Sequence, residues 1–259
     1  MENEIYKELV RLSSLCEDAA LVTVISASGS TPQEEGAKML VRSDGSIIGT
    51  IGGGNIEEQS IREAFTSMKI GKPRRLTYHL AEGEDSIMAC GGDMEIFIEP
   101  VLAEPGLFIF GGGHIGLALT KMARLTGFKI KAIDDRSEFA APQRFPEVEQ
   151  VLLSDFDAAF SKLTVHSSDY IVILTHAHKG DEIVLEQALK TKAKYIGMIG
   201  SAKKNELVFS HLRKKGFPQD VLDKVYTPIG LRIRAQTPAE IAVSILAEMI
   251  KVRRADPEI

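Results

Sequence analysis

Three glycines in the middle of the chain have the spacing of a phosphate-binding turn. Gly111, Gly113 and Gly116 form the pattern G-x-G-x-x-G directly after an apolar run, and an apolar-periodic stretch follows. In a strand–turn–helix unit the first glycine permits the tight turn, the second lets a phosphate approach the backbone, and the third lets the helix pack against the sheet. The spacing therefore predicts a dinucleotide-type site, with His114 at one of its variable positions.

Charged side chains follow the next apolar run of the chain. Asp134, Asp135 and Arg136 come roughly 20 residues after the glycines, where a carboxylate usually binds a ribose hydroxyl. Arg136 has two interpretations, because it could pair with a second phosphate or could simply be solvated. We predict that Asp134, Asp135 and Arg136 line the same ligand site as the glycine motif.

Two imidazoles and a carboxylate follow a later apolar run. His176, His178 and Asp181 lie just after residues 170–174, and loops at the carboxyl ends of parallel strands line the ligand crevice. Such groups could bind a metal ion or act as acid and base. The structural alternative is that His176 caps a helix or bonds to the backbone and that His178 is exposed. Because no further cysteine or histidine stands at the spacing of a zinc site, we predict ligand-binding roles and no metal.

Two glycine-rich segments precede the central motif. Gly52, Gly53 and Gly54 stand before a helical pattern, which makes either an anion-binding nest or a tight strand-to-helix turn. Cys90 is followed by Gly91, so its thiol is expected to be accessible and could accept a sulfur atom or contact a soft metal. The alternative for Cys90 is a small buried hydrophobe before a strand.

A further junction of strand, glycine and helix is expected at Gly200 and Ser201. Lys203 and Lys204 would then lie in the first helical turn, where cations oppose the helix dipole. A nearby anion would explain this placement, and solvation of the two side chains is the alternative. We include Ser201 among the predicted binding residues.

Two different scaffolds are needed to position these residues. From residue 107 onward, apolar runs alternate with helical patterns, which is typical of a parallel sheet. Strands are expected at 107–110, 129–133, 170–174 and 195–199, and helices at about 114–126, 180–191, 201–215 and 237–253. The preceding part predicts helices at 4–18 and 55–68 and strands at 20–27, 38–42, 47–51, 76–80 and 94–98. We predict an α/β chain with a smaller N-terminal α+β domain over 1–103, a proline-containing linker, and a Rossmann-like parallel-sheet domain over 107–259.

Composition limits the function classes. The chain has 31 Lys and Arg against 36 Asp and Glu, a net charge of −5, which argues against non-specific nucleic-acid binding. No apolar run approaches the ~18 residues of a membrane-spanning helix, and the first residues lack a signal-peptide pattern. Two cysteines form no disulfide framework. We therefore expect a cytoplasmic protein with neither nucleic acid nor membrane as a partner.

In order and spacing, these segments resemble the XdhC/CoxI family, accessory proteins of molybdenum hydroxylases such as xanthine dehydrogenase. The resemblance covers nearly the whole chain. Its segments are Gly29–Pro32, Gly36–Leu40, Gly49–Gly54 with Glu57, Cys90–Gly92, Gly111–Gly116, Asp134–Arg136, Thr175–His178 with Asp181, Gly197–Ser201, Thr227–Gly230 and Thr237–Ala242. The chain departs from the family pattern at Gln33, Asn55, Arg232 and Arg234.

The resemblance implies a chaperone and not a turnover enzyme. Such a protein would bind molybdenum cofactor (molybdopterin) and support its sulfuration by a cysteine desulfurase. It would then deliver the cofactor to a xanthine dehydrogenase-type molybdenum hydroxylase of purine catabolism, often as a homodimer. The cofactor is an anionic pterin whose phosphate would suit a glycine-rich helix N-terminus.

Two other functions stay open at this point. One is an oxidoreductase that binds NAD(P) through the glycine motif and Asp134, although the second half has no Tyr-x-x-x-Lys pair. The other is a metal-dependent hydrolase built on His176, His178 and Asp181, which lacks further ligands of telling spacing.

Overall fold

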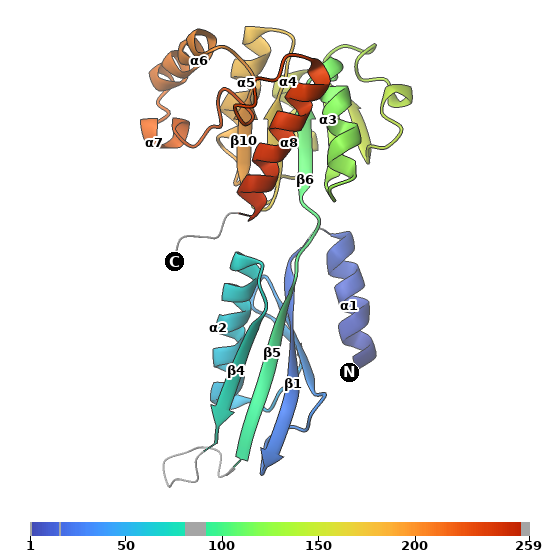
Figure 1. The fold of residues 1–259 in the computed structure, drawn as a ribbon, viewed down its shortest axis with the longest axis vertical. Helices are drawn as coiled ribbons and strands as arrows, with labels where there is room; N and C mark the ends of the chain where they lie inside the picture. Colours follow the sequence, from blue (N-terminus) through green and yellow to red (C-terminus); the bar gives the residue numbers. More distant parts are fainter. Residues whose placement is uncertain (1, 16, 81–91, 255–259) are drawn as a thin grey trace. The chain divides into compact units, whose positions relative to one another are not determined.

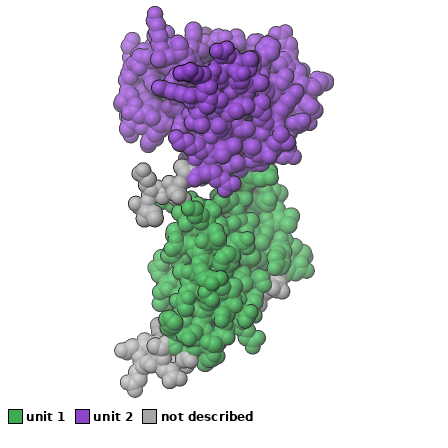
Figure 2. Space-filling model, in the orientation of Figure 1, with its two compact units in different colours: residues 1–104, 256–259 green, residues 105–255 purple. Residues whose placement is uncertain are grey.

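The computed structural model describes residues 2–15, 17–80 and 92–254. The described residues divide into two compact units, one up to residue 104 and one from residue 105, which Figure 2 colours separately. Each unit has its own sheet and its own buried core. Among the described residues, no helix is both long and apolar enough to cross a membrane.

The first unit is a five-stranded antiparallel sheet with a helix on each face (Figure 1). The strand order is β3 (Ile47–Gly49), β2 (Lys38–Arg42), β1 (Ala19–Gly29), β5 (Gly92–Val101) and β4 (Arg74–His79). Two helices, α1 (Glu2–Ser14) and α2 (Gly54–Ile70), cover it. Alternation along β2 divides the core, because Met39 and Val41 pack with residues of α2 whereas Leu40 packs with residues of α1.

The second unit is a five-stranded parallel sheet in the order β10-β9-β6-β7-β8. Its strands are β6 (Gly106–Phe110), β7 (Lys129–Asp134), β8 (Gln150–Leu153), β9 (Tyr170–Ile173) and β10 (Tyr195–Met198). The chain passes from β6 outward to β8 and then returns to β9 on the other side of β6. This reversal creates a switch point between β6 and β9, where ligands bind in such sheets. The predicted Rossmann-like α/β fold is confirmed.

Helices cover both faces of this sheet (Figure 1). One face carries α3 (His114–Arg124) and α8 (Pro238–Arg254), which pack against each other. The other carries α4 (Phe156–Ala159), α5 (His178–Ala188) and α6 (Ala202–Lys214). Short helical segments are η1 (Pro142–Arg144), η2 (Phe160–Lys162) and α7 (Gln219–Leu222).

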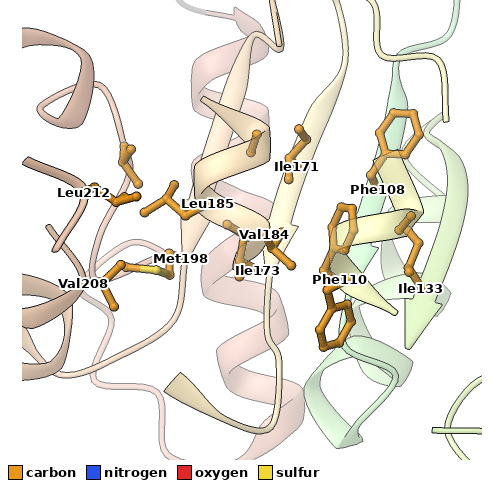
Figure 3. Packing of buried hydrophobic residues seen from close by; sticks show 14 of the residues in the cluster. Phe108, Phe110, Ile133, Ile171, Ile173, Val184, Leu185, Met198, Val208 and Leu212 are labelled. Carbon is orange, nitrogen blue, oxygen red and sulfur yellow. The ribbon is translucent and has the colours of Figure 1, made fainter. Parts of the chain in front are cut away.

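The central strands β6 and β9 are buried on both faces, as parallel strands between helix layers must be. In β6, Phe108 and Phe110 face the layer of α5 and α6, whereas Leu107 and Ile109 face α3 and α8. Figure 3 shows the buried cluster on the α5 and α6 face of the sheet, where side chains of β6 and β9 pack beside Val184, Leu185 and Leu212.

Several elements differ from the sequence prediction. The first helix ends at Ser14 and not near residue 18. The edge strand β8 was not predicted, because its four residues, two of them exposed and two half-buried, show no clear period of two.

Truncation of Leu185, a fully buried residue of α5, to alanine should lower the free energy of unfolding by about 2–5 kcal/mol, because a cavity would form in the core. The matched control is Leu207→Ala in α6, whose side chain is 53% exposed and should cost less than about 0.5 kcal/mol. Urea denaturation of both variants measures the difference. Equal losses would contradict the described core.

Candidate functional site

The glycine motif forms the turn between β6 and α3 at the switch point of the parallel sheet. Gly111 has φ +120° and lies against the backbone after β9, so that a Cβ atom there would stand 2.2 Å from the carbonyl oxygen of Leu174. A Cβ atom on Gly116 would stand 2.1 Å from the Gly111 carbonyl oxygen. Both positions need glycine because backbone segments touch there.

Gly113 is a glycine for a different reason. Its φ of −67° suits any residue, and a Cβ atom there would meet nothing within 4 Å. Gly113 is also the N-cap of α3, and no side chain caps this helix. The first turn of α3, with His114, therefore offers amide N–H groups and a positive dipole end to an open space. This arrangement can hold a phosphate or another anion.

Gly112, the middle residue of the turn, is held by hydrogen bonds on both sides. The Gly112 N–H donates to Asp134 Oδ2 at 2.8 Å, and the Gly112 carbonyl oxygen accepts from Arg144 Nη2 at 3.1 Å. A Cβ atom on Gly112 would also stand 2.2 Å from the Phe139 carbonyl oxygen. The glycine turn is therefore preorganised by its neighbours before any ligand binds.

Asp134 is buried and fully used inside the protein. Its two oxygens accept from the Gly112 N–H and, at 2.9–3.1 Å, from the backbone N–H, Nε and Nη2 of Arg136. Burial opposes ionisation of this carboxyl, but the bonds from Arg136 and Gly112 outweigh it, so the pKa of Asp134 lies below its usual value. The carboxylate expected to bind a ribose hydroxyl thus has no lone pair to spare.

The neighbouring carboxylate is the one that faces solvent. Asp135 is exposed, and its Oδ1 lies 3.7 Å from Nδ1 of His176 in the loop after β9. Ligand atoms of Asp134, Asp135 and His176 all lie within 4.8 Å of one another. Because Asp134 already accepts four hydrogen bonds, only two of these groups are available, which is fewer than a metal site needs.

The loop Thr175–His178 separates the predicted residues into two groups. His176, on one side of it, lies with Asp135 and the glycine turn. His178 instead lines a groove with Ser201, at the first turns of α5 and α6. The structure thus brings most predicted residues of the second unit to the carboxyl edge of the sheet, but at two places.

Asp181 is fully buried between α5 and α6. Its Oδ1 accepts from the Thr175 hydroxyl at 2.6 Å, and its Oδ2 lies 2.6 Å from Nζ of Lys204. This carboxylate therefore holds the loop and the two helices together, and it presents no free oxygen to a ligand.

The N–H groups of the glycine-rich loop before α2 are bound by a carboxylate of the protein itself. Oε1 of Glu57, in the first turn of α2, accepts from the N–H groups of Ile51 at 3.1 Å and Gly53 at 2.9 Å, and also from the Thr50 hydroxyl. Gly52, with φ +125°, packs against the ring of Pro32. The hydrogen bonds support the tight-turn interpretation of Gly52–Gly54 over an empty anion nest.

Two predicted residues of the first unit, Cys90 and Gly91, lie outside the described residues. Their expected roles remain predictions.

Sequence reasoning missed Arg144 and Phe139 beside the glycine turn. The Arg136 guanidinium lies 3.7 Å from the centroid of the Phe139 ring, and that of Arg144 lies 4.9 Å from it. Phe139 and Arg144 stand in the connection between β7 and β8, Arg144 at the end of the short helix η1, where no periodicity or motif marks them.

Two models of known protein families match this chain, one in each of its two units. The family model described as the XdhC Rossmann domain matches residues 107–249. The model described as the XdhC and CoxI family matches residues 16–79.

Three curated relatives are similar to this chain. YqeB of Escherichia coli K12, named as an uncharacterized protein, is 34% identical over 98% of this chain and 47% of its own length. A protein of Bacillus subtilis 168, named as a probable subunit of xanthine dehydrogenase, is 29% identical over 61% of this chain and 46% of its own. The molybdenum cofactor insertion chaperone PaoD of Escherichia coli K12 is 25% identical over 91% of this chain and 83% of its own. The chain thus spans about half the length of the first two.

One solved structure has the same fold along almost the whole chain. The crystal structure of a xanthine dehydrogenase from Bacillus halodurans matches with a TM-score of 0.54 and 22% sequence identity. The match covers 96% of each chain.

Alanine at Gly116 should lower the free energy of unfolding by at least about 2 kcal/mol, because the new Cβ atom would press on the Gly111 carbonyl oxygen. Gly113→Ala should lower it by no more than about 1 kcal/mol, since the space there is open and only the weaker N-cap preference of alanine is lost. Thermal or urea unfolding measures both variants. A large loss at Gly113 would contradict an open space above α3.

Removal of the Glu57 carboxylate should destabilise the glycine loop. Glu57→Ala leaves the Ile51 and Gly53 N–H groups without their acceptor and should cost about 1–3 kcal/mol. The adjacent control, Glu58→Ala, loses only an exposed ion pair with Arg62 and should cost less than about 0.5 kcal/mol. Urea unfolding compares them, and similar losses would refute the role of Glu57.

Proposed function

Because this chain belongs to the XdhC and CoxI family, we propose that it is a chaperone that binds molybdenum cofactor for a molybdenum hydroxylase of the xanthine dehydrogenase type. The similarity to PaoD carries the proposal, since it extends over 91% of this chain and involves a protein named for cofactor insertion. The similarity to the Bacillus subtilis protein named for xanthine dehydrogenase supports the class of recipient enzyme.

The glycine turn fits the phosphate of such a cofactor. A Cβ atom on Gly113 would occupy open space at the uncapped start of α3, and a phosphate needs that combination of room and N–H donors. We assign Gly113 and His114 to the phosphate, and Asp135 and His176 to polar groups of the pterin. When bound, the cofactor supplies the molybdenum centre that the recipient enzyme uses.

The residues around the turn would bind and orient the cofactor by hydrogen bonds and charge. The Asp134–Arg136 ion pair has no net charge, and Asp134 fixes the backbone of Gly112. The pair therefore sets the shape of the glycine turn and adds no charge to it. Arg144 donates to backbone oxygens only, and no described carboxylate pairs with it, so it contributes positive potential beside the turn. Hydrogen bonds and charge of this kind would permit release of the cofactor. Asp135 and His176 are two exposed ligands only, which is too few to coordinate a metal ion fully.

Membership of the family suggests further roles that the glycine turn itself does not address. We propose that the chain is a chaperone without turnover chemistry, that a cysteine desulfurase supplies sulfur to the cofactor, and that the Cys90 thiol takes part in that step. A homodimer and a cytoplasmic location belong to the same proposal.

Anaerobic titration of the protein with molybdenum cofactor, followed by absorbance and co-elution, tests this function. Gly113→Asp should retain full stability, because aspartate is a favoured N-cap residue. Its carboxylate would take the place of the phosphate and should weaken cofactor binding at least about tenfold. The matched control is Leu125→Asp at the other end of α3, where the side chain is 87% exposed and φ is −64°, and its binding should equal that of the wild type.

A second readout is activation of a cofactor-free xanthine dehydrogenase by the loaded protein. Binding that is unaffected by Gly113→Asp, or a wild-type protein that binds no cofactor, would overturn the proposal. Saturable binding of NADH or NADPH, lost in Gly113→Asp, with no cofactor binding would instead identify a nicotinamide-dependent protein.

A further inference from the structure

A groove opens on the opposite side of the loop Thr175–His178 from the glycine turn. We call it the α5–α6 groove, and its volume is about 560 Å³. It is lined by His178, Ser201, Lys203, Lys204, Glu206, Leu207 and Ser210. Its size is that of a pocket for a small organic molecule.

Positive charge gathers at the helix ends that border this groove. His178 is the first residue of α5, and Lys203 and Lys204 lie in the first turn of α6, which contains no acidic residue. A cation at a helix N-terminus is unfavourable, because it adds to the positive end of the dipole. The sequence thus places side chains where they destabilise the free helix, which is common at functional sites.

Part of this charge is neutralised inside the protein. Lys204 is paired with the buried Asp181 at 2.6 Å, and its side chain is only 18% exposed. Glu206, the acid that lines the groove, is paired with Arg213. Within the described residues, no ion pair involves Lys203, so its ammonium gives the groove an uncompensated positive charge.

The groove also has a polar donor and an apolar wall. The Ser201 oxygen accepts from the Lys204 backbone N–H at 3.3 Å, which leaves its hydroxyl hydrogen available to a ligand. Leu207 lines the same groove and is 53% exposed. An inorganic phosphate ion would use the donors but leave this side chain in water.

We propose that the α5–α6 groove is a binding site for an organic phosphate, with the phosphate beside Lys203 and Ser201 and the organic body along Leu207. This inference rests on the groove and on the excess of positive charge inside it. The N-termini of α5 and α6 add to the positive potential there. Binding here is separate from the glycine turn and does not depend on the chaperone function.

Titration with phenyl phosphate and with inorganic phosphate, followed by NMR shifts of backbone amides, tests the site. In the wild type, both anions should shift the amides of residues 201–204, and phenyl phosphate should bind more tightly. Lys203→Glu should weaken both anions at least about tenfold. The same variant should raise Tm, because an acid in the first turn suits the helix dipole. Such opposite changes in binding and stability are expected of a functional residue.

Two further variants separate the parts of the proposal. Leu207→Ser should reduce phenyl phosphate affinity to the level of inorganic phosphate without changing the latter. Lys121→Glu, the same charge reversal at an exposed position of α3, should leave both affinities unchanged. The proposal is wrong if the wild type shows no saturable binding, if Lys203→Glu binds like Lys121→Glu, or if the shifts appear at Gly113 and His114 instead.

Discussion

The site in the second unit depends on one buried carboxylate. Asp134 accepts the Gly112 N–H and three hydrogen bonds from Arg136, so it joins the end of β7 to the turn after β6. An isolated buried carboxylate would be costly, and this one is stable because its lone pairs are satisfied. The same bonds fix the backbone beside Gly113, which leaves an open space next to a helix terminus that no side chain caps. The shape of the phosphate site is thus set by an interaction that involves no ligand.

The loop after β9 gives the carboxyl edge of the sheet two distinct environments. On one side, His176 lies near the exposed Asp135, where the local charge is mixed. On the other, His178 shares a groove with Lys203, where positive charge exceeds negative. Asp181 keeps these environments apart, because its bonds to Thr175 and Lys204 tie the loop to the helices. A single Rossmann-like sheet can in this way offer separate places for ligands of different chemistry.

The sequence predicted the fold where the signal is local and repeated. The G-x-G-x-x-G spacing and the alternation of apolar runs identified β6, α3 and the parallel sheet, because glycine positions and periodicity depend on neighbours in the chain. The roles of Asp134 and Asp135 could not be separated, since the two stand side by side and only the tertiary hydrogen bonds of Gly112 and Arg136 decide which is consumed. Glu57 entered the sequence analysis only as part of the family resemblance, and nothing in the sequence marks it as the group that accepts hydrogen bonds from the loop before α2. Arg144 and the groove wall at Leu207 have no sequence signature, because irregular backbone and helix packing bring them into place.

The carboxylate of Glu57 gives the first unit an intramolecular counterion. A backbone nest that waits for a soluble anion changes its occupancy with buffer composition, because free phosphate and chloride compete for it. In the loop before α2 the acceptor is covalently attached, so its effective concentration is fixed by the chain and does not change with the buffer. The shape of that loop is therefore insulated from the ionic composition of its surroundings.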